Sequence, residues 1–278
     1  MNRGGTSTVQ AAALAAPPSG RLPSRLGRAH LIMVRDLMVH RHQWTILAFG
    51  ILEPVLYLLS IGIGVGRMVG HLNGLGGPAV TYPEYVAPAL LAMAAMNGAS
   101  NSTTQQVFAR LRFDNTYQIM LTTPVSPRDI AVGEVGWAML RGGIESTGFL
   151  AVMAVMNLVH SPWALLAVPG ALLIGFAFAS VGLFVATFLR GWQDFQLIQL
   201  VMLPMFLFAT TFYPLRVYPG FIRVLVSCLP LYHSINLVRE PILGSAGTQL
   251  LLPAGYLAAM GLLGLWLAVR RLERVLID

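Results

Sequence analysis

Six long apolar segments are the feature that most constrains the fold of this chain. They lie near residues 45–66, 85–108, 134–158, 163–189, 195–214 and 250–269. Each has about the 20 residues that an α-helix needs to cross the hydrocarbon core of a bilayer. Only 10% of the residues are charged, against about 25% in soluble domains, and the cost of placing charge in lipid explains this depletion. The sequence therefore predicts an all-α membrane protein with six transmembrane helices.

The arginines predict the orientation of the chain. All 18 basic residues are arginine; thirteen fall on the side of the two termini, four on the other side, and Arg141 lies within the third segment. Because cytoplasmic loops carry an excess of positive charge, both termini are expected in the cytoplasm. Ser126-Pro127 and Ser161-Pro162 are typical N-caps followed by a first-turn proline, and they predict the starts of the third and fourth helices.

Two regions precede the first span. Residues 1–24 are rich in Ala, Pro, Gly, Ser and Thr and are predicted to form a disordered cytoplasmic tail. Residues 25–43 predict an amphipathic helix at the membrane surface; a cytosolic extension of the first span is the alternative. The charged side of this helix contains Arg25, Arg28, Arg35 and Asp36.

Segment 215–243 is largely apolar but contains charged residues and several prolines, which a lipid-facing helix would not tolerate. Two short helices, at about 219–228 and 231–243, fit it better. Irregular backbone at membrane depth is tolerated where protein or a water-filled cavity covers it. We interpret the segment as a re-entrant hairpin on the outer side, and a surface loop with two interfacial helices as the alternative.

Ionisable residues in the third span are candidates for function. Glu134, Arg141 and Glu145 lie within about 40° of one another on a helical wheel, and membrane-embedded charges usually pair or face water. A static ion-pair network between packed helices is the favoured interpretation. The alternative is a polar stripe that transmits motion or lines a cavity.

Two further sets of side chains are candidates for a translocation pathway. Asn97, Asn101 and Thr104 form a polar stripe on the second span. Gln196, Gln199 and Phe206 belong to the fifth. Small and polar residues also hold membrane helices together, so pathway and helix packing explain both sets equally well.

The sequence lacks the residues that several kinds of chemistry require. A nucleotide-hydrolysing P-loop requires a lysine after a glycine-rich turn, and the chain contains no lysine. Its one cysteine, Cys228, excludes an internal disulfide and a cysteine-based metal site. We see no catalytic set, so the chain is expected to be a non-catalytic subunit without a cofactor or metal of its own. Energy from ATP would have to come through a partner.

The loop between the second and third spans predicts a short presented helix. Asp114 or Asn115 can cap a helix that runs to about Leu121, and Thr122-Thr123-Pro124 ends it. A single short helix of this kind is suited to docking into the groove of a partner. A plain connector is the alternative.

Three stretches resemble the ABC type-2 permease family. LRFDNTYQIMLTTPVSPRDIAVGE (111–134) is similar to its coupling region, and FYPLRVYPGFIRVLVSCLPLYHSINLVREPILG (212–244) resembles its outer segment after the fifth span. LEPVLYLLSIGIGVG (52–66) is similar to the first span of the nodulation-type lipo-oligosaccharide export branch.

The resemblance implies an assembly and roles for several segments. Two permease copies, expected to form a homodimer in the bacterial inner membrane, would pair with two cytosolic ATPase subunits. Segment 114–124 would be the coupling element, and 25–43 would be the connecting helix. The residues implied in coupling are Asp114, Tyr117, Thr122, Thr123 and Pro124. Those implied in the outer gate of segment 215–243 are Pro219, Pro230, His233 and Glu240.

The function that this resemblance implies is export of a lipid-linked or amphiphilic saccharide, such as a lipo-oligosaccharide or polysaccharide. A drug or antibiotic efflux permease of the same family is the nearest alternative. An ion-coupled secondary transporter, which typically shows inverted repeats and midplane acids, and a membrane scaffold without transport are more distant alternatives. Membrane lipids are expected partners and nucleic acid is not.

Overall fold

The computed structural model describes residues 25–40, 44–69, 71–72, 80–114, 116–245 and 247–277. The predicted tail 1–24 and residues 41–43 of the predicted amphipathic helix lie outside the described residues. The described α-helices are α2 (Arg25–His40), α3 (Trp44–Tyr57), α4 (Gly64–Val69), α5 (Tyr82–Asn101), α6 (Val107–Arg112), α7 (Thr116–Leu121), α8 (Pro127–Val155), α9 (Ala167–Ala186), α10 (Phe195–Phe208), α11 (Gly220–Ser227), α12 (Pro230–Ile242) and α13 (Leu251–Ile277).

Short helical turns of other types join several of these helices. The π-helical turns are η1 (Leu58–Ile63) and η2 (Ser102–Gln106). The 3-10 turns are η3 (Pro162–Leu166), η4 (Trp192–Asp194), η5 (Leu215–Val217) and η6 (Thr248–Leu250). An all-α fold does not account for β1 (His71–Leu72) and β2 (Val80–Thr81), which pair antiparallel with His71 opposite Thr81.

Within the described residues, four helical segments are long and apolar enough to cross a membrane: 48–66, 127–155, 162–186 and 248–276. The bent pair α11–α12, with an angle of 80° between its helices, would be a fifth if it counts as one span. The chain is therefore a mostly helical membrane protein with several apolar helices.

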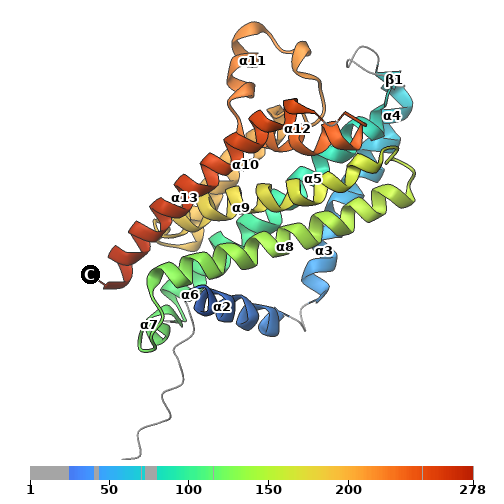
Figure 1. The fold of residues 1–278 in the computed structure, drawn as a ribbon. Helices are drawn as coiled ribbons and strands as arrows, with labels where there is room; N and C mark the ends of the chain where they lie inside the picture. Colours follow the sequence, from blue (N-terminus) through green and yellow to red (C-terminus); the bar gives the residue numbers. More distant parts are fainter. Residues whose placement is uncertain are drawn as a thin grey trace, which may run out of the picture.

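The centre of the bundle is α9, which packs against α5, α8 and α13 (Figure 1). Small residues allow this close approach, as they do in other membrane helix pairs. A Cβ atom on Gly264 of α13 would lie 3.0 Å from the backbone nitrogen of Val181, and one on Gly175 would lie 3.2 Å from Cα of Met139 on α8. Side-chain packing around these helices forms the core.

The two ends of the bundle differ in what they carry. Helices α2, α6 and α7 lie at one end, which we call the α7 end, and α4, α11 and α12 lie at the other, the α12 end (Figure 1). Helix α2 packs against α8, with Ile32 and Asp36 buried and Leu31, Leu37 and Met38 exposed. Asp36 and the half-buried Arg35 therefore face the protein, and the apolar side chains of Leu31, Leu37 and Met38 face outward.

Local sequence signals explain where the long helices begin. Ser126 caps α8 in a capping box with Asp129, and Ser161 caps η3 by accepting a hydrogen bond from the Trp163 backbone nitrogen. Both helix starts are as the sequence predicts. Segment 215–243 forms two short helices, which is also as predicted.

Helix α10 ends at Phe208, six residues before the predicted boundary at 214. Thr210 adopts a left-handed backbone conformation, with φ of 63°, that an α-helix cannot continue through. The Thr210 carbonyl accepts hydrogen bonds from Tyr85 and Arg239. These contacts with α5 and α12 hold the chain out of helical geometry at this point.

Candidate functional sites

A cluster of four charged side chains lies at the α7 end and joins α2, α6 and α8. Arg110 Nη2 lies 2.9 Å from Asp36 Oδ1, and Arg110 Nη1 lies 2.6 Å from Glu134 Oε1. Arg35 Nη2 contacts the same two carboxylates, at 2.8 Å and 3.2 Å. The two acids are almost fully buried, Asp36 at 0% and Glu134 at 2% exposed. Two cations and two anions balance, so the cluster as a whole is neutral.

Helix α7 rests on this charge cluster. The Tyr117 side chain is 1% exposed, and Arg35 Nη1 lies 3.3 Å from Sδ of Met120. Burial and the charge of Glu134 raise the pKa of the Tyr117 phenol well above its ordinary value. Burial alone would lower the pKa of the Arg110 guanidinium, but Glu134 and Asp36 raise it above its ordinary value. The four ion pairs of the cluster join α2, α6 and α8, and α7 packs against them through Tyr117 and Met120.

The exposed side of α7 and the turn after it form a protruding surface at this end. Ile119 is 66% exposed, and Asp114, Thr122, Thr123 and Pro124 are also exposed. The two threonine hydroxyls donate hydrogen bonds to the Ile119 and Met120 carbonyls, which also accept hydrogen bonds from the Thr122 and Thr123 backbone nitrogens. Of the predicted coupling residues, Tyr117 faces the protein and the others face outward. Asn115, the alternative cap, lies outside the described residues.

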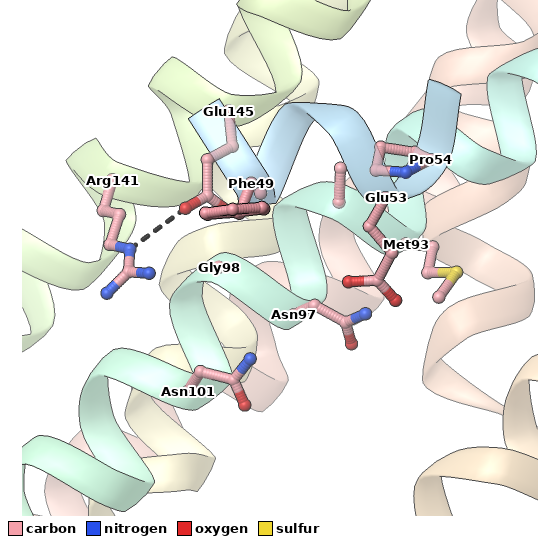
Figure 2. A pocket seen from close by; sticks show the side chains of 11 residues that line it. Phe49, Glu53, Pro54, Met93, Asn97, Gly98, Asn101, Arg141 and Glu145 are labelled. Carbon is pink, nitrogen blue, oxygen red and sulfur yellow. Dashed lines mark hydrogen bonds and ion pairs between the residues drawn. The ribbon is translucent and has the colours of Figure 1, made fainter. Parts of the chain in front are cut away.

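A polar cavity of about 170 Å³ lies between α3, α5 and α8 (Figure 2). Polar side chains from all three helices line it. They are Glu53 from α3, Asn97 and Asn101 from α5, and Arg141 and Glu145 from α8. Phe49, Pro54 and Met93 supply apolar lining. The Arg141 Nε atom donates to Glu145 Oε1 at 3.0 Å.

Two glycines make room for Glu145 between α3 and α5. A Cβ atom on Gly50 would lie 2.6 Å from the Glu145 carboxyl carbon, and one on Gly98 would overlap Glu145 Oε2. The Glu145 side chain is 3% exposed. The carboxylate is thus held from two sides, and it holds the guanidinium of Arg141 in turn.

The predicted stripe on the third span divides between these two sites. Glu134 belongs to the charge cluster, whereas Arg141 and Glu145 line the cavity. Of the predicted pathway residues, Asn97 and Asn101 line the cavity with them. Thr104 is buried and donates to the Ser100 carbonyl of its own helix.

The predicted pathway residues of α10 lie elsewhere. Gln196 and Gln199 are exposed. The Phe206 ring packs near the rings of Tyr57 and Phe212, at 6.3 Å and 5.3 Å between centroids. The structure therefore brings only part of the predicted pathway set into one cavity.

The predicted gate residues lie at the α12 end. Pro219 precedes α11, Pro230 is the first residue of α12, and Glu240 is half-buried. The His233 ring is stacked on Tyr256 of α13 with centroids 4.2 Å apart. The prolines thus mark the helix starts on either side of the bend.

Arg239 is a residue of the α12 end that the sequence did not single out for a role. It is 7% exposed and lies over the Tyr85 ring, with Cζ 3.9 Å from the centroid. It donates to the Tyr85 hydroxyl at 3.2 Å and to the Thr210 carbonyl at 2.9 Å. Arg239 therefore ties α12 to α5 and to the end of α10. An arginine within the largely apolar segment 215–243 was the available signal.

The fold and these sites define a class of protein. Among the described residues no three His, Cys, Asp or Glu side chains are placed to hold a metal ion. A helical bundle with apolar spans, a polar cavity between them and a presented helix at one end is the architecture of a membrane transport subunit. The comparison with known families agrees: the chain belongs to the ABC-2 type transporter family, whose model matches residues 29–243. It is a permease subunit of an ABC transporter, a class that uses ATP through a partner ATPase.

Curated relatives of this chain are nodulation proteins J from rhizobia. It is 33% identical to nodulation protein J of Rhizobium leguminosarum bv. viciae over 74% of this chain and 78% of that protein. It is 31% identical to nodulation protein J of Rhizobium meliloti over 80% and 83%. It is 32% identical to nodulation protein J of Sinorhizobium fredii over 81% and 85%. The resemblance to the nodulation branch is thereby confirmed.

Proposed function

We propose that this chain is the permease subunit of an ATP-driven exporter that moves a lipid-linked or amphiphilic saccharide out of the cytoplasm. The observation that carries the proposal is the presented α7 surface in a member of the ABC-2 type transporter family. Helix α7 is anchored to α2, α6 and α8 through the charge cluster, and Ile119 on its outer side is 66% exposed. The nodulation branch of the family is the reason to name a saccharide.

Helix α7 would be the coupling helix. ATP would be hydrolysed by two copies of a cytosolic partner, because the chain has no lysine for a P-loop. Ile119 would enter an apolar groove of the ATPase, with Asp114 and Thr122–Pro124 at the rim of the contact. Tyr117 would transmit force into the bundle instead of touching the partner, since it is buried against the charge cluster.

Six spans with both termini in the cytoplasm of a bacterium remain the proposed topology. The arginine distribution supports it, and it places the α7 end in the cytoplasm and the α12 end outside the inner membrane. The α5–η2–α6 run and α10 would complete the six. The bent pair α11–α12 would be the re-entrant outer gate. Its proposed residues are Pro219 before α11, Pro230 at the start of α12, and His233 and Glu240 within α12.

A second copy of the permease is the proposed membrane partner of α10. This helix leaves a row of large apolar side chains exposed, among them Leu197, Leu200 and Val201, at 63–68%. Substrate would pass between the two copies, with Gln196, Gln199 and Phe206 on the pathway side. Membrane lipid would cover the remaining apolar surface.

The test is copurification of the permease with cytosolic ATPases encoded by neighbouring genes. We expect Ile119→Asp to abolish copurification and permease-stimulated ATP hydrolysis, because a carboxylate in an apolar docking groove is costly. Val155→Asp is the matched control; this residue is 82% exposed at the far end of α8, and its change should leave both measurements intact. Equal copurification and ATPase activity in the two variants would refute the coupling role of α7.

A further inference from the structure

The polar side chains of the cavity retain most of their hydrogen-bonding capacity. Among the described residues, the carboxylate of Glu53 and the side-chain amides of Asn97 and Asn101 make no hydrogen bond or ion pair. Arg141 commits Nε to Glu145, and Figure 2 shows its two terminal nitrogens turned away from that carboxylate. Four polar side chains from three helices therefore converge on one space without satisfying one another.

The polar residues of the cavity lie within long apolar helices. Arg141 and Glu145 lie near the middle of α8, which is 29 residues long, and Glu53 lies within the apolar segment 48–66. Polar groups at such depth are costly unless they find partners or line a water-filled space. The unused donors and acceptors thus indicate a polar occupant.

The cavity is built to hold its shape. Gly50 and Gly98 leave the space that the Glu145 side chain fills, and Glu145 fixes Arg141. The π-helical turn η1 begins at Leu58, soon after Glu53, and η2 begins directly after Asn101. Such turns are frequent at functional sites, and here they adjoin the two helices that bring Glu53 and Asn101 to the cavity.

The lining defines the chemistry of the occupant. Two carboxylates and one guanidinium give the cavity one net negative charge and an excess of acceptors, while the two amides both donate and accept. Hydroxyl groups both donate and accept hydrogen bonds. A rigid ring that carries several hydroxyls therefore matches this lining. Phe49, 68% exposed at the mouth, offers an apolar face beside them.

The volume of the cavity fits one ring, while Glu53 and Asn101 of its lining are exposed. A volume of about 170 Å³ would hold roughly six water molecules at about 30 Å³ each. It is below the roughly 300–1,000 Å³ of sites that enclose a drug-sized ligand. We propose that this cavity binds one hydroxyl-rich sugar ring of the exported amphiphile, with its chain left in the surrounding lipid. This inference rests on the proposed function.

The test measures equilibrium binding of radiolabelled dodecyl glucoside to the permease–ATPase complex in nanodiscs. Dodecyl tetra(ethylene glycol) is the probe with the same chain but no sugar. We expect Glu53→Gln and Asn101→Leu each to raise the Kd for dodecyl glucoside about threefold to tenfold, the loss of one hydrogen bond. Gln105→Leu, on the same helical run but outside the cavity lining, is the matched control and should leave the Kd unchanged.

Other outcomes would overturn the proposal. Unchanged glucoside binding in both cavity variants, or equal losses for the glucoside and the glycol ether, would show that the cavity does not recognise a sugar. Competition by dodecyl trimethylammonium with a lower Kd than the glucoside would show a cation site instead.

A failure of this inference can be told apart from a failure of the proposed function. If the cavity variants still hydrolyse ATP with the partner and export the native substrate at the wild-type rate, only the sugar site is refuted. If no cytosolic ATPase copurifies with the wild-type chain, the proposed function itself fails.

Discussion

Removing Glu134 should destabilise the protein through the charge that it leaves behind. The carboxylate oxygens lie 2.6 and 2.7 Å from Nη1 of Arg110, and the two side chains are 2% and 12% exposed, so water screens them little. At an effective dielectric constant of about 20, unit charges about 4 Å apart attract by about 4 kcal/mol. Desolvation offsets part of this attraction, but removing one partner of a buried pair typically costs about 3–5 kcal/mol. Glu134→Gln would leave the cluster with one excess positive charge.

A double-mutant cycle isolates the interaction. We expect Glu134→Gln and Arg110→Gln together to cost about 1–3 kcal/mol less than the sum of the single changes, because the second change removes the unpaired partner. The free energy of unfolding would be measured by SDS denaturation of the purified permease in mixed micelles.

An exposed pair of the same chain provides the control cycle. Arg128 Nε lies 3.0 Å from Glu273 Oε1, close to the spacing in the cluster, but these side chains are 68% and 33% exposed. Exposed pairs contribute about 0–1 kcal/mol. Additive effects at Glu134 and Arg110, or equal coupling energies in the two cycles, would refute the view that α7 rests on a strongly coupled buried cluster.

Two further predictions use the same purified protein. Gly98→Ala should lower the free energy of unfolding by about 1–3 kcal/mol, because the added Cβ would overlap Glu145. Gly255→Ala, whose Cβ would meet open space, should be neutral or stabilise by up to about 1 kcal/mol. Equal effects of the two changes would contradict the close packing of Gly98 against Glu145. Burial raises the pKa of the Glu84 carboxyl, but hydrogen bonds with His160 and Thr81 lower it overall below its ordinary value of 4.5. A lowered folded-state pKa means that this contribution to stability is present above about pH 4.5 and is lost as the pH falls through the folded pKa. The Tm difference between wild type and Glu84→Gln should therefore be larger at about pH 7 than at about pH 3.5, and a difference independent of pH would refute the assignment.

Features that depend on near neighbours in the chain were predictable from the sequence. The N-cap serines and first-turn prolines that start α8 and η3 involve residues at most three positions apart. The break between α11 and α12 follows from Pro230, which is the first residue of α12. The short helix α7 followed from the turn residues Thr122–Pro124. In each case a local signal sufficed.

The partners of the buried charges could not be predicted in this way. A helical wheel shows which side of a helix a residue faces but not its position along the helix axis. At 1.5 Å per residue, Glu134 lies about 16 Å along the axis from Glu145. The helical wheel therefore placed Glu134 of the charge cluster in the same stripe as Arg141 and Glu145 of the cavity. Arg35 and Arg110 reach Glu134 from positions 99 and 24 residues away, through the packing of α2 and α6 on α8. The sequence also gave no sign that Gly50 and Gly98 enclose Glu145.

Helix α8 is the element that connects the two candidate sites. It runs for 29 residues from Pro127, with no proline inside and no π-helical turn, whereas η1 and η2 interrupt the regular hydrogen bonding of the segments that follow Glu53 and Asn101. A regular helix shifts as one unit, while π-helical turns are places where a helix can yield. A displacement of α8 at its α7 end would therefore carry Arg141 and Glu145 along and change the cavity relative to Glu53 and Asn97. Under the proposed coupling role of α7, this geometry would give a docked ATPase a direct mechanical path to the cavity.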